Sequence, residues 1–352
     1  MSKARELADL GSVTDKLEEV GNTDGALSNR NLLINSAMQV AQRGTSETGV
    51  TASHYVNACD RYRVNGNNGT WTISQDTDAP AGFSNSFKML LTATETISST
   101  SYWSVEQKIE GQNLQGLAYG TSSAKTVTVS FYVKSNITGT YCLNLYQDDG
   151  NKNFPKTYTI DSADTWEYKT ISFAGDTSTA LDNDNASSLR TQFFVVGGSD
   201  YTSGSAGSRV AYTNSTFAAG QSAQVDAVND YWQITGVQLE VGDTATPFEH
   251  RSYGDELAKC QRYYQTVVNN TFREYVYNVH RHPIPLKVTM RSAPTCTVYH
   301  DGSAGPTTGV DTGYFTTESG TVAVSTAAVG ASPGSNQMVD IVNLDIFADA
   351  EL

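Results

Sequence analysis

The segment KTVTVSFYVKS, residues 125–135, constrains the fold of this chain more than any other stretch. Its apolar residues Val127, Val129, Phe131 and Val133 alternate strictly with polar residues or tyrosine. This two-residue period is typical of a β-strand that buries one face and leaves the other in water. The segment therefore predicts a half-buried strand at the edge of a hydrophobic core.

Other segments of the chain predict strands in the same way. They are residues 69–75, 86–94, 103–110, 140–148, 166–175, 191–198 and 230–242. Turn-rich loops rather than helices separate them, which favours an antiparallel sandwich or jelly roll. The composition agrees, because 38% of residues are apolar, 17% are charged and 10% are aromatic, with abundant Thr and Tyr. We therefore expect a mainly β fold.

The order of these segments predicts three parts: a short N-terminal helix and linker, an antiparallel jelly-roll sandwich, and a smaller C-terminal β domain. Their expected bounds are 1–30, 31–252 and 253–352. Within the second part, residues 176–229 form a long Ser-, Gly- and Asp-rich connection around one strand. Connections of that length are usually functional or in contact with a partner.

The N-terminal helix is predicted from residues 2–20, where Leu10, Val13, Leu17 and Val20 follow a 3-4-3 spacing. A helix this short is marginal alone in water, so its apolar stripe needs a partner. The stripe either lies on its own domain or pairs with copies of itself in a small bundle. Disorder is the remaining alternative. In the second case the segment would dock or trimerise the protein.

The stretch from Trp232 to Tyr264 marks the end of the sandwich. Gly236 breaks the alternation of its first half, which predicts a β-bulge in the closing strand. Gly242-Asp243 and Pro247 then end that strand, and residues 249–264 lead the chain away. Although this second half is rich in charge and aromatic rings, we interpret it as a joint between domains rather than a site.

Charge and cysteine usage exclude several classes of protein. The formal net charge of −14 disfavours nucleic acid, which needs clustered Lys and Arg. No apolar run reaches the length of a bilayer span, and MSKARELADLG lacks the apolar core of a signal peptide. We therefore expect no membrane insertion and no export by the Sec route. The four cysteines are widely spaced, which favours buried thiols in a cytosolic compartment.

Three segments, in order, carry a resemblance to a known family. NRNLLINSAMQVAQRGTS with CDRYRV resembles the opening of a jelly-roll domain in structural proteins of tailed bacteriophages, cyanophages in particular. DYWQITGVQLEVGDTATPFEHRSYGDELAKCQRYYQ resembles its closing strand and exit, and PLKVTMRSAPT resembles an element just downstream. The segments bracket residues 31 to about 297. The resemblance implies a virion tail fibre or receptor-binding protein, often trimeric.

A weaker resemblance concerns the fold of the sandwich. DTWEYKTISFAG is similar to the Trp-containing strand of jelly-roll carbohydrate-binding modules. It implies a carbohydrate-binding-like fold and carries no ligand-binding signature of its own.

Two histidines are candidate metal ligands. His280 and His282 form an H-x-H motif in a strand-like run, so both rings would point to one face. One copy offers too few ligands, whereas three copies around a trimer axis would offer six nitrogens, a set suited to iron or nickel. Phage fibre tips use H-x-H in this way, as the resemblance implies. Here Pro283 follows directly, and surface histidines are the alternative.

Carboxylates that are close in sequence are candidates for catalytic pairs, calcium ligands or turn residues. They are Asp148 with Asp149, Asp182 with Asp184, and Asp255 with Glu256. A glycan-degrading enzyme needs two carboxylates facing each other across a groove. Loop carboxylates can also bind a structural calcium ion. Carboxylates of this kind more commonly stabilise turns or lie on solvated surfaces. No nucleophile, zinc or phosphate-loop motif is present.

Aromatic residues are the candidate ligand-binding residues, because sugar rings stack on exposed Tyr and Trp. Those near strand ends or in loops are Tyr102, Trp103, Tyr146, Tyr201 and Tyr231. Of the predicted set Tyr102, Trp103, Tyr146 and Tyr201, we favour Tyr146 and Tyr201 for a surface role. Within or at the start of strands, core positions are expected for Trp71, Trp166 and Trp232.

We therefore expect a non-enzymatic virion protein, a homotrimeric tail fibre assembled in the host cytoplasm. It would contact other virion proteins through its N-terminal segment and a host surface glycan or protein through the jelly roll. Because the chain is acidic, a neutral glycan or a protein fits better than a polyanion. The alternatives are a polysaccharide-degrading tailspike, a carbohydrate-binding module of a secreted enzyme, and a fibre on the capsid or neck.

Overall fold

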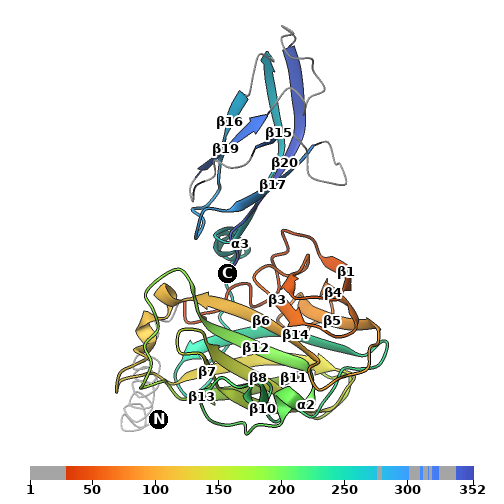
Figure 1. Cartoon of the computed structure of the whole chain (residues 1–352), viewed down its shortest axis with the longest axis vertical. Coiled ribbons are helices and arrows are strands. Elements are labelled where there is room, and N and C mark those ends of the chain that lie inside the picture. The colour runs from red at the N-terminus through yellow and green to blue at the C-terminus, as the bar shows by residue number, and fades with distance from the viewer. Residues whose placement is uncertain (1–28, 276–279, 301–309, 312–315, 317–318, 325–337) are drawn as a thin grey trace, which may run out of the picture. The chain divides into compact units, whose positions relative to one another are not determined.

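The chain divides into two compact units, residues 1–251 and 252–352. The computed structural model describes residues 29–275, 280–300, 310–311, 316, 319–324 and 338–352 (Figure 1). The helix predicted over residues 2–20 lies outside these residues. In the described chain, no helix is both long enough and apolar enough to cross a membrane.

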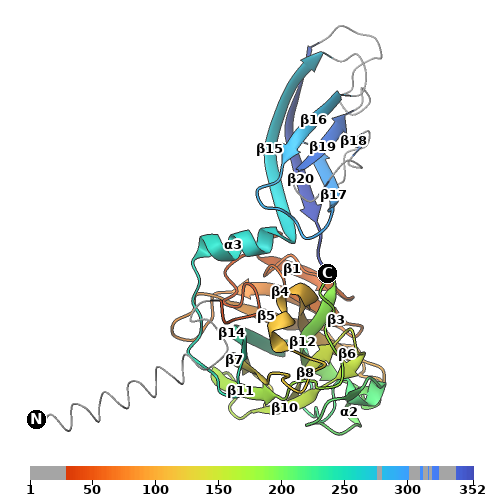
Figure 2. The same ribbon diagram turned by 90° about the vertical axis from the view of Figure 1, so that its left-hand side faces the viewer.

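The first unit is an antiparallel jelly-roll sandwich, so the predicted mainly β fold is confirmed (Figures 1 and 2). One layer is a six-stranded sheet. Its strands, in spatial order, are β1 (Ser46–Val50), β4 (Thr70–Asp76), β5 (Ser86–Ala93), β14 (Tyr231–Val241), β7 (Val127–Ser135) and β11 (Glu167–Phe173).

The other layer is an eight-stranded sheet. Its strands, in spatial order, are β13 (Val210–Ala211), β9 (Lys152–Asn153), β8 (Gly139–Gln147), β12 (Ser187–Gly197), β6 (Tyr102–Glu110), β3 (Arg63–Gly66) and β2 (His54–Tyr55), while β10 (Pro155–Ile160) pairs with β8. Consecutive sheet neighbours are often distant in sequence, as expected for a jelly roll.

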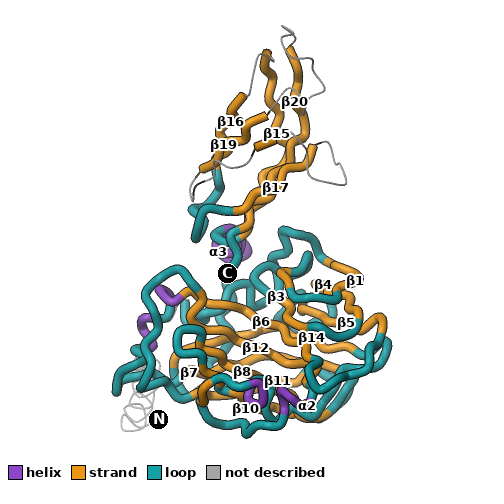
Figure 3. The backbone as a smooth tube through the Cα atoms, viewed as in Figure 1, coloured by secondary structure: helices purple, strands orange, loops and turns teal. Residues whose placement is uncertain are grey.

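Helical turns in this unit are short and lie in the connections between strands (Figure 3). They are η1 (Gly111–Asn113), η2 (Gln115–Leu117), α2 (Ser199–Thr202) and η3 (Asn214–Thr216). Two of them, α2 and η3, belong to the long connection that precedes β14. That connection also contains β13, so it adds an edge strand to the larger sheet.

The core lies between the two sheets and is built from alternate residues of their strands. The four apolar residues of β7, from Val127 to Val133, are fully buried, as the two-residue period predicts. Trp71 of the six-stranded sheet packs against Trp103 of the eight-stranded sheet, with ring centroids 5.7 Å apart. Trp232 packs against Phe193 at 6.0 Å in the same way. Aromatic contacts therefore join the two layers.

Core positions predicted for two tryptophans are confirmed, because Trp71 and Trp232 are fully buried. The third prediction is wrong, since Trp166 is half-buried in the loop before β11 and donates a hydrogen bond to Asp78 at 3.0 Å. All four cysteines are thiols, and three of them are buried, as expected: Cys59, Cys142 and Cys260.

The second unit begins with the helix α3 (Tyr253–Gln261), which Ser252 caps by accepting a hydrogen bond from the backbone of Asp255. Two three-stranded antiparallel sheets follow. They are β15 (Tyr264–Tyr275), β20 (Met338–Asp349) and β17 (Thr295–His300) in one sheet, and β16 (His280–Pro285), β19 (Ser319–Val324) and β18 (Val310–Asp311) in the other. This is a smaller β domain.

The β-bulge predicted at Gly236 is confirmed. The register of β14 against β7 shifts between Thr235 and Gln238, and Gly236 has a φ of +60°. The ring of Phe83 packs on the backbone here, so a β-carbon at Gly236 would lie 2.6 Å from that ring. Glycine is therefore required for two reasons. It adopts the left-handed backbone conformation without strain, and it leaves room for the Phe83 ring.

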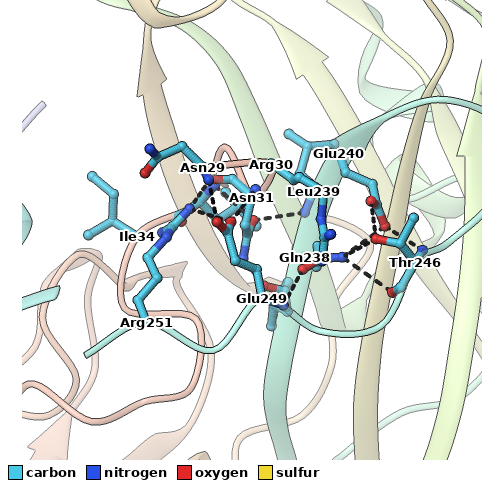
Figure 4. A network of polar contacts seen from close by, with 12 residues as sticks. Asn29, Arg30, Asn31, Ile34, Gln238, Leu239, Glu240, Thr246, Glu249 and Arg251 are labelled. Atoms are coloured by element: carbon cyan, nitrogen blue, oxygen red, sulfur yellow. Dashed lines mark hydrogen bonds and ion pairs between the residues drawn. The ribbon is translucent and has the colours of Figure 1, made fainter. Parts of the chain in front are cut away.

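A polar network ties the two ends of the sandwich together (Figure 4). The carboxylate of Glu249 accepts hydrogen bonds from the backbone N–H groups of Asn29 and Asn31. Arg251 pairs with Glu249 at 3.0 Å and also donates to the carbonyls of Asn31 and Leu33. We call Glu249, Arg251 and the segment 29–33 the terminal clamp. The terminal clamp gives a structural role to two charged residues of the predicted joint, Glu249 and Arg251.

The same region holds the start of the chain against the closing strand. The Asn31 side chain donates to the carbonyl of Val237 at 2.9 Å and accepts from the backbone N–H of Leu239 at 3.0 Å. Through these two hydrogen bonds, the side-chain amide of Asn31 pairs with the backbone of β14 as a neighbouring strand would. The residues flanking the sandwich therefore enter and leave at one point.

Replacing Gly236 with alanine should lower the free energy of unfolding by about 1–3 kcal/mol, because the left-handed backbone and the Phe83 ring both resist a β-carbon. Urea unfolding followed by fluorescence measures this. The control is Gly116→Ala, where nothing lies within 4 Å of the added atom. Equal effects of the two substitutions would contradict the bulge argument.

The terminal clamp should make stability depend on acid pH. Burial alone would raise the pKa of Glu249, but hydrogen bonds from the backbone of Asn31 and the charge of Arg251 outweigh it and lower that pKa. The stabilisation is then present above the unfolded pKa of about 4.3 and lost as pH falls through the lower folded value. Glu249→Gln should flatten the acid side of a plot of unfolding free energy against pH, and an unchanged slope would refute this role.

Candidate functional site

The outward face of the eight-stranded sheet carries the candidate site. On β6, Trp103, Val105 and Ile109 point into the core. Their neighbours Glu106 and Lys108 therefore point outward, because side chains alternate along a strand. The same alternation places polar and aromatic residues of β3, β8 and β12 on this face.

A row of hydrogen-bonded side chains, which we call the polar row, crosses this face over the five neighbouring strands β3, β6, β12, β8 and β9. Glu106 pairs with Arg63 on one side and accepts a hydrogen bond from Gln192 at 2.8 Å on the other. The amide of Asn144 donates to Gln192 at 3.0 Å and to Asn153 at 2.7 Å. Because these buried groups satisfy one another, the row is held in one arrangement.

A second row lies beside the first and combines positive charge with an aromatic ring. Arg190 makes a two-point ion pair with Asp148, whose other contact is the hydroxyl of Ser187 at 2.7 Å. The guanidinium of Arg190 lies over the ring of Tyr146, 5.2 Å from its centroid. Lys108 is the direct cross-strand neighbour of Arg190. The ion pair fixes Arg190, and through it the position of the Tyr146 ring.

Burial and neighbouring charges shift the pKa values of two basic residues on this face, Lys108 and Arg190. Burial lowers the pKa of Lys108, and the neighbouring charges of Arg190 and Arg63 add to that effect. For Arg190, burial acts in the same direction, but the hydrogen bonds and charge of Asp148 outweigh it and raise the pKa. Asp148 therefore stabilises Arg190, whereas Lys108 sits between like charges.

A cluster of aromatic rings, which we call the tyrosine cluster, covers the adjoining part of the face. Its members are Tyr102, Tyr146, Tyr201, Tyr212 and Phe217. The ring centroids of Tyr102 and Tyr201 lie 5.2 Å apart, and both rings meet Phe217 edge to face. Tyr146 joins through Tyr212 at 6.0 Å. The cluster therefore connects with the second row.

Two strands and one connection supply the cluster. Tyr102 and Tyr146 stand on strands β6 and β8, while Tyr201, Tyr212 and Phe217 come from the long connection before β14. Phe217 packs on Phe194 of the sheet at 4.8 Å and anchors the connection there. Half-buried tyrosines on a rigid base suit a ligand that needs both a flat apolar surface and hydroxyl groups.

Three tyrosine hydroxyls of this cluster remain protonated at neutral pH. Burial raises the pKa of Tyr102, Tyr146 and Tyr212 above the ordinary value near 10. At neutral pH each hydroxyl can therefore donate as well as accept a hydrogen bond. Tyr102 donates to Asn65 at 3.2 Å and Tyr146 to Asn151 at 2.7 Å, which orients both rings.

The structure brings together three of the four residues predicted to bind a ligand, namely Tyr102, Tyr146 and Tyr201. Their binding role stays a prediction. For Trp103 the prediction is wrong, because its ring is fully buried between the sheets and has no face left for a ligand. Tyr231, another candidate for ligand binding, lies at the start of β14, and its hydroxyl donates a hydrogen bond to Asp164.

Sequence reasoning missed several residues of this face. Tyr212 and Phe217 lie in the connection 176–229, whose length alone marked it as functional. The polar row was missed because Arg63, Glu106 and Gln192 come together only through strand pairing. The alternation within residues 103–110 was a usable signal, since it separates outward Glu106 from inward Val105.

Three of the carboxylates predicted as catalytic, calcium-binding or turn residues make local contacts of the kind found in turns and helix caps. Asp149 accepts a hydrogen bond from the backbone of Asp182 at 2.9 Å, and Asp184 accepts one from Ala186 at 2.9 Å. Asp255 belongs to the capped first turn of α3. No group of three or more His, Cys, Asp or Glu residues able to hold a metal ion occurs in the described part of the chain.

The H-x-H motif lies in β16, where the backbone of His280 pairs with Val324 and that of His282 with Val322. The side chains of both histidines lie outside the described residues. Metal binding on a trimer axis therefore stays a prediction.

A separate cavity of about 420 Å³ lies at the edge of the eight-stranded sheet. Lys152, Phe154, Asp176 and Arg209 line it. Burial alone would raise the pKa of Asp176, but hydrogen bonds from Lys152 and Ser178 outweigh it and lower that pKa to about 2. Arg209 lies over Phe154, 5.0 Å from its ring centroid. Lys152 and Asp176 thus pair with each other, while Arg209 donates to Gln147 and to the carbonyl of Ala174.

No family model matches the sequence, and no curated protein sequence matches it. Among solved structures, the chain is similar to the enzymatically active domain of tailspike protein 4 of bacteriophage CBA120, with 11% identity, a TM-score of 0.33, and coverage of 60% of this chain. The chain spans only 22% of that protein.

Two further structures are similar over the same kind of β domain. A putative sugar binding protein of Bacteroides thetaiotaomicron shows 13% identity and a TM-score of 0.34, covering 60% of this chain and 100% of its own. The xylan-binding CBM22-1 domain of Paenibacillus barcinonensis Xyn10C shows 11% identity and a TM-score of 0.28, covering 63% and 100%. The structural neighbours thus include a phage tailspike and carbohydrate-binding modules.

Proposed function

We propose that the first unit is a glycan-binding domain and that its binding surface is the outward face of the eight-stranded sheet. The observation that carries this proposal is the tyrosine cluster beside the polar row. Half-buried rings and their hydroxyl donors lie together on one rigid sheet, and the buried polar row beside them holds its strands in one arrangement. A sugar needs this combination, because its ring faces are apolar and its edges carry hydroxyl groups.

Binding on this face would need little rearrangement. The polar row is already hydrogen-bonded, and the Arg190 ion pair already positions the Tyr146 ring. A surface that is ordered before binding loses less conformational entropy when the ligand arrives. The shallow contact would still be weak for one copy, so several copies acting together would give useful avidity.

We extend the proposal to the whole chain as a non-catalytic, trimeric tail fibre of a phage virion that recognises the host surface. The resemblance of residues 29–46, 230–265 and 285–295 to phage structural proteins supports it. The alternative is a polysaccharide-degrading tailspike. In a retaining or inverting enzyme of that kind, two carboxylates lie about 5–10 Å apart across the groove. Glu106 is not suited to that role, since it is buried and paired with Arg63.

Substituting a ring of the cluster should weaken glycan binding. Tyr146→Ala and Tyr201→Ala are each expected to reduce affinity by about three- to tenfold, or roughly 0.5–1.5 kcal/mol for one lost stacking contact. Fluorescently labelled protein on a glycan array identifies a bound glycan, and titration calorimetry then measures each variant.

The matched control is Tyr168→Ala, because Tyr168 is 48% exposed on the opposite, six-stranded sheet. It should bind as the unsubstituted protein does. Circular dichroism confirms that all three variants fold. Equal affinity of the cluster variants and the control would place the binding surface elsewhere.

Trimerisation is tested by sedimentation equilibrium of the full chain, which should give the mass of three copies. Replacing both Leu10 and Leu17 with aspartate should shift the mass towards a single copy if the predicted N-terminal stripe holds the trimer together. A stable monomer of the unsubstituted chain would refute the trimeric fibre.

A further inference from the structure

The cavity of about 420 Å³, which we call the edge cavity, is lined by two loops at the margin of the sandwich. One loop, residues 174–178, follows β11, an edge strand of the six-stranded sheet. The other, residues 207–211, belongs to the long connection and contains β13, an edge strand of the eight-stranded sheet. None of the described residues that line the cavity belongs to the tyrosine cluster. The edge cavity is therefore a separate place on the first unit.

The walls of the edge cavity are held in place by the rest of the domain. A β-carbon on Gly175 would lie 2.6 Å from the backbone of Ala124, so the first loop packs tightly against a neighbouring segment. Arg209 links the two loops by donating to the carbonyl of Ala174 at 3.0 Å. It also donates to Gln147 at the end of β8, at 3.1 Å. A site with ordered walls loses little conformational entropy when a ligand binds.

Arg209 is the lining residue best suited to hold a ligand. Its guanidinium lies over the rings of Tyr119 and Phe154, 5.2 and 5.0 Å from their centroids. A guanidinium has five N–H donors, and the bonds to Gln147 and Ala174 use two of them. Even with a third donated to the hydroxyl of Tyr119, two N–H groups have no acceptor in the described chain. Two such donors are what a carboxylate, sulfate or phosphate group binds.

No carboxylate pairs with Arg209 in the described chain, because its hydrogen-bond partners are a neutral amide and a carbonyl. Of the described residues that line the edge cavity, Asp176 is the one carboxylate. It pairs with Lys152 at 2.6 Å and accepts two hydrogen bonds from Ser178. The negative charge of the cavity is therefore already matched, whereas the charge of Arg209 is not.

The two carboxylates that follow β8 are also bonded elsewhere. Asp148 makes the two-point ion pair with Arg190, and Asp149 accepts a backbone hydrogen bond. Behind the cavity, the ammonium of Lys156 lies 5.3 Å from the ring centroid of Phe154 and adds a further positive charge. The surroundings of the edge cavity thus favour an anion, although the whole chain is acidic. Screening by salt confines the influence of more distant charges to about 8–10 Å.

We propose that the edge cavity is a second binding site, which takes a small polar molecule whose carboxylate, sulfate or phosphate group binds to Arg209. Its volume of about 420 Å³ lies within the range of small-molecule pockets, about 300–1,000 Å³. The hydroxyl-bearing residues Thr177 and Ser208 are exposed on its lining and can meet the polar remainder of the ligand. The site goes beyond the proposed glycan-binding face and does not depend on it.

The test uses galactose derivatives that differ in the group at carbon 6. Galacturonate carries a carboxylate, galactose 6-sulfate a sulfate and galactose 6-phosphate a phosphate, and galactose is the neutral reference. Titration calorimetry with the full chain should show at least one charged probe binding about tenfold more tightly than galactose, because hydrogen bonds between charged groups are stronger than neutral ones. Raising the salt concentration should weaken only the binding of the charged probe.

Substitutions assign the effect to the edge cavity. Arg209→Met keeps the apolar stem, removes the guanidinium and should abolish the preference for the charged probe. Ser208→Trp narrows the cavity, leaves Arg209 in the chain and should weaken binding of the charged probe by about tenfold. The matched control is Arg43→Met, which removes an arginine that lies over Tyr55 of β2, at the other end of the eight-stranded sheet. The control should bind as the unsubstituted protein does, and unchanged urea midpoints confirm folding.

Three results would overturn the inference. They are no charged probe binding more tightly than galactose, an unchanged preference in Arg209→Met, and an equal loss of preference in Arg43→Met. If Arg209→Met does not fold, Ser208→Trp decides alone, and unchanged binding by that variant would place the site elsewhere. Binding of an array glycan through the tyrosine cluster is measured separately, so either proposal can fail while the other stands.

Discussion

The contact between Trp71 and Trp103 joins the two sheets, and the arrangement of the binding face depends on it. Both indole N–H groups donate to the carbonyl of Asn68, so the rings are hydrogen-bonded as well as packed. With Trp103 fixed in the core, every second residue of β6 must follow it inward. Lys108 is thereby turned to the outside, and Glu106 to the buried polar row. The same packing that stabilises the sandwich thus determines which residues of β6 face away from the core.

Local patterns predicted much of the fold. The alternation of Val127 to Val133 identified a half-buried strand, and Gly236 identified a bulge, because both signals lie within a few residues. The error at Trp103 was avoidable, since Trp103 shares the phase of Val105 and Ile109 within its own strand. Trp166 could not be placed in this way, because it lies in a loop where no period applies.

The site was harder to predict because it is assembled across strands. Arg63 is far from Gln192 in the chain, and their meeting at Glu106 depends on how three strands pair. Strand register is set by the whole hydrophobic pattern and not by a motif. Tyr146 and Tyr201 were found by residue type and position alone. Their ring partners, Tyr212 for Tyr146 and Phe217 for Tyr201, needed the path of a long connection, which composition does not give.

The terminal clamp has a consequence for how such a protein can change. Because Asn29 and Glu249 are hydrogen-bonded to each other, the chain enters and leaves the sandwich through neighbouring positions. Domains whose ends lie close together can be inserted, removed or exchanged with little effect on the rest of a chain. The sandwich is therefore suited to act as a replaceable cassette. A different jelly roll ending in the same clamp could present another face while the flanking segments kept their connection.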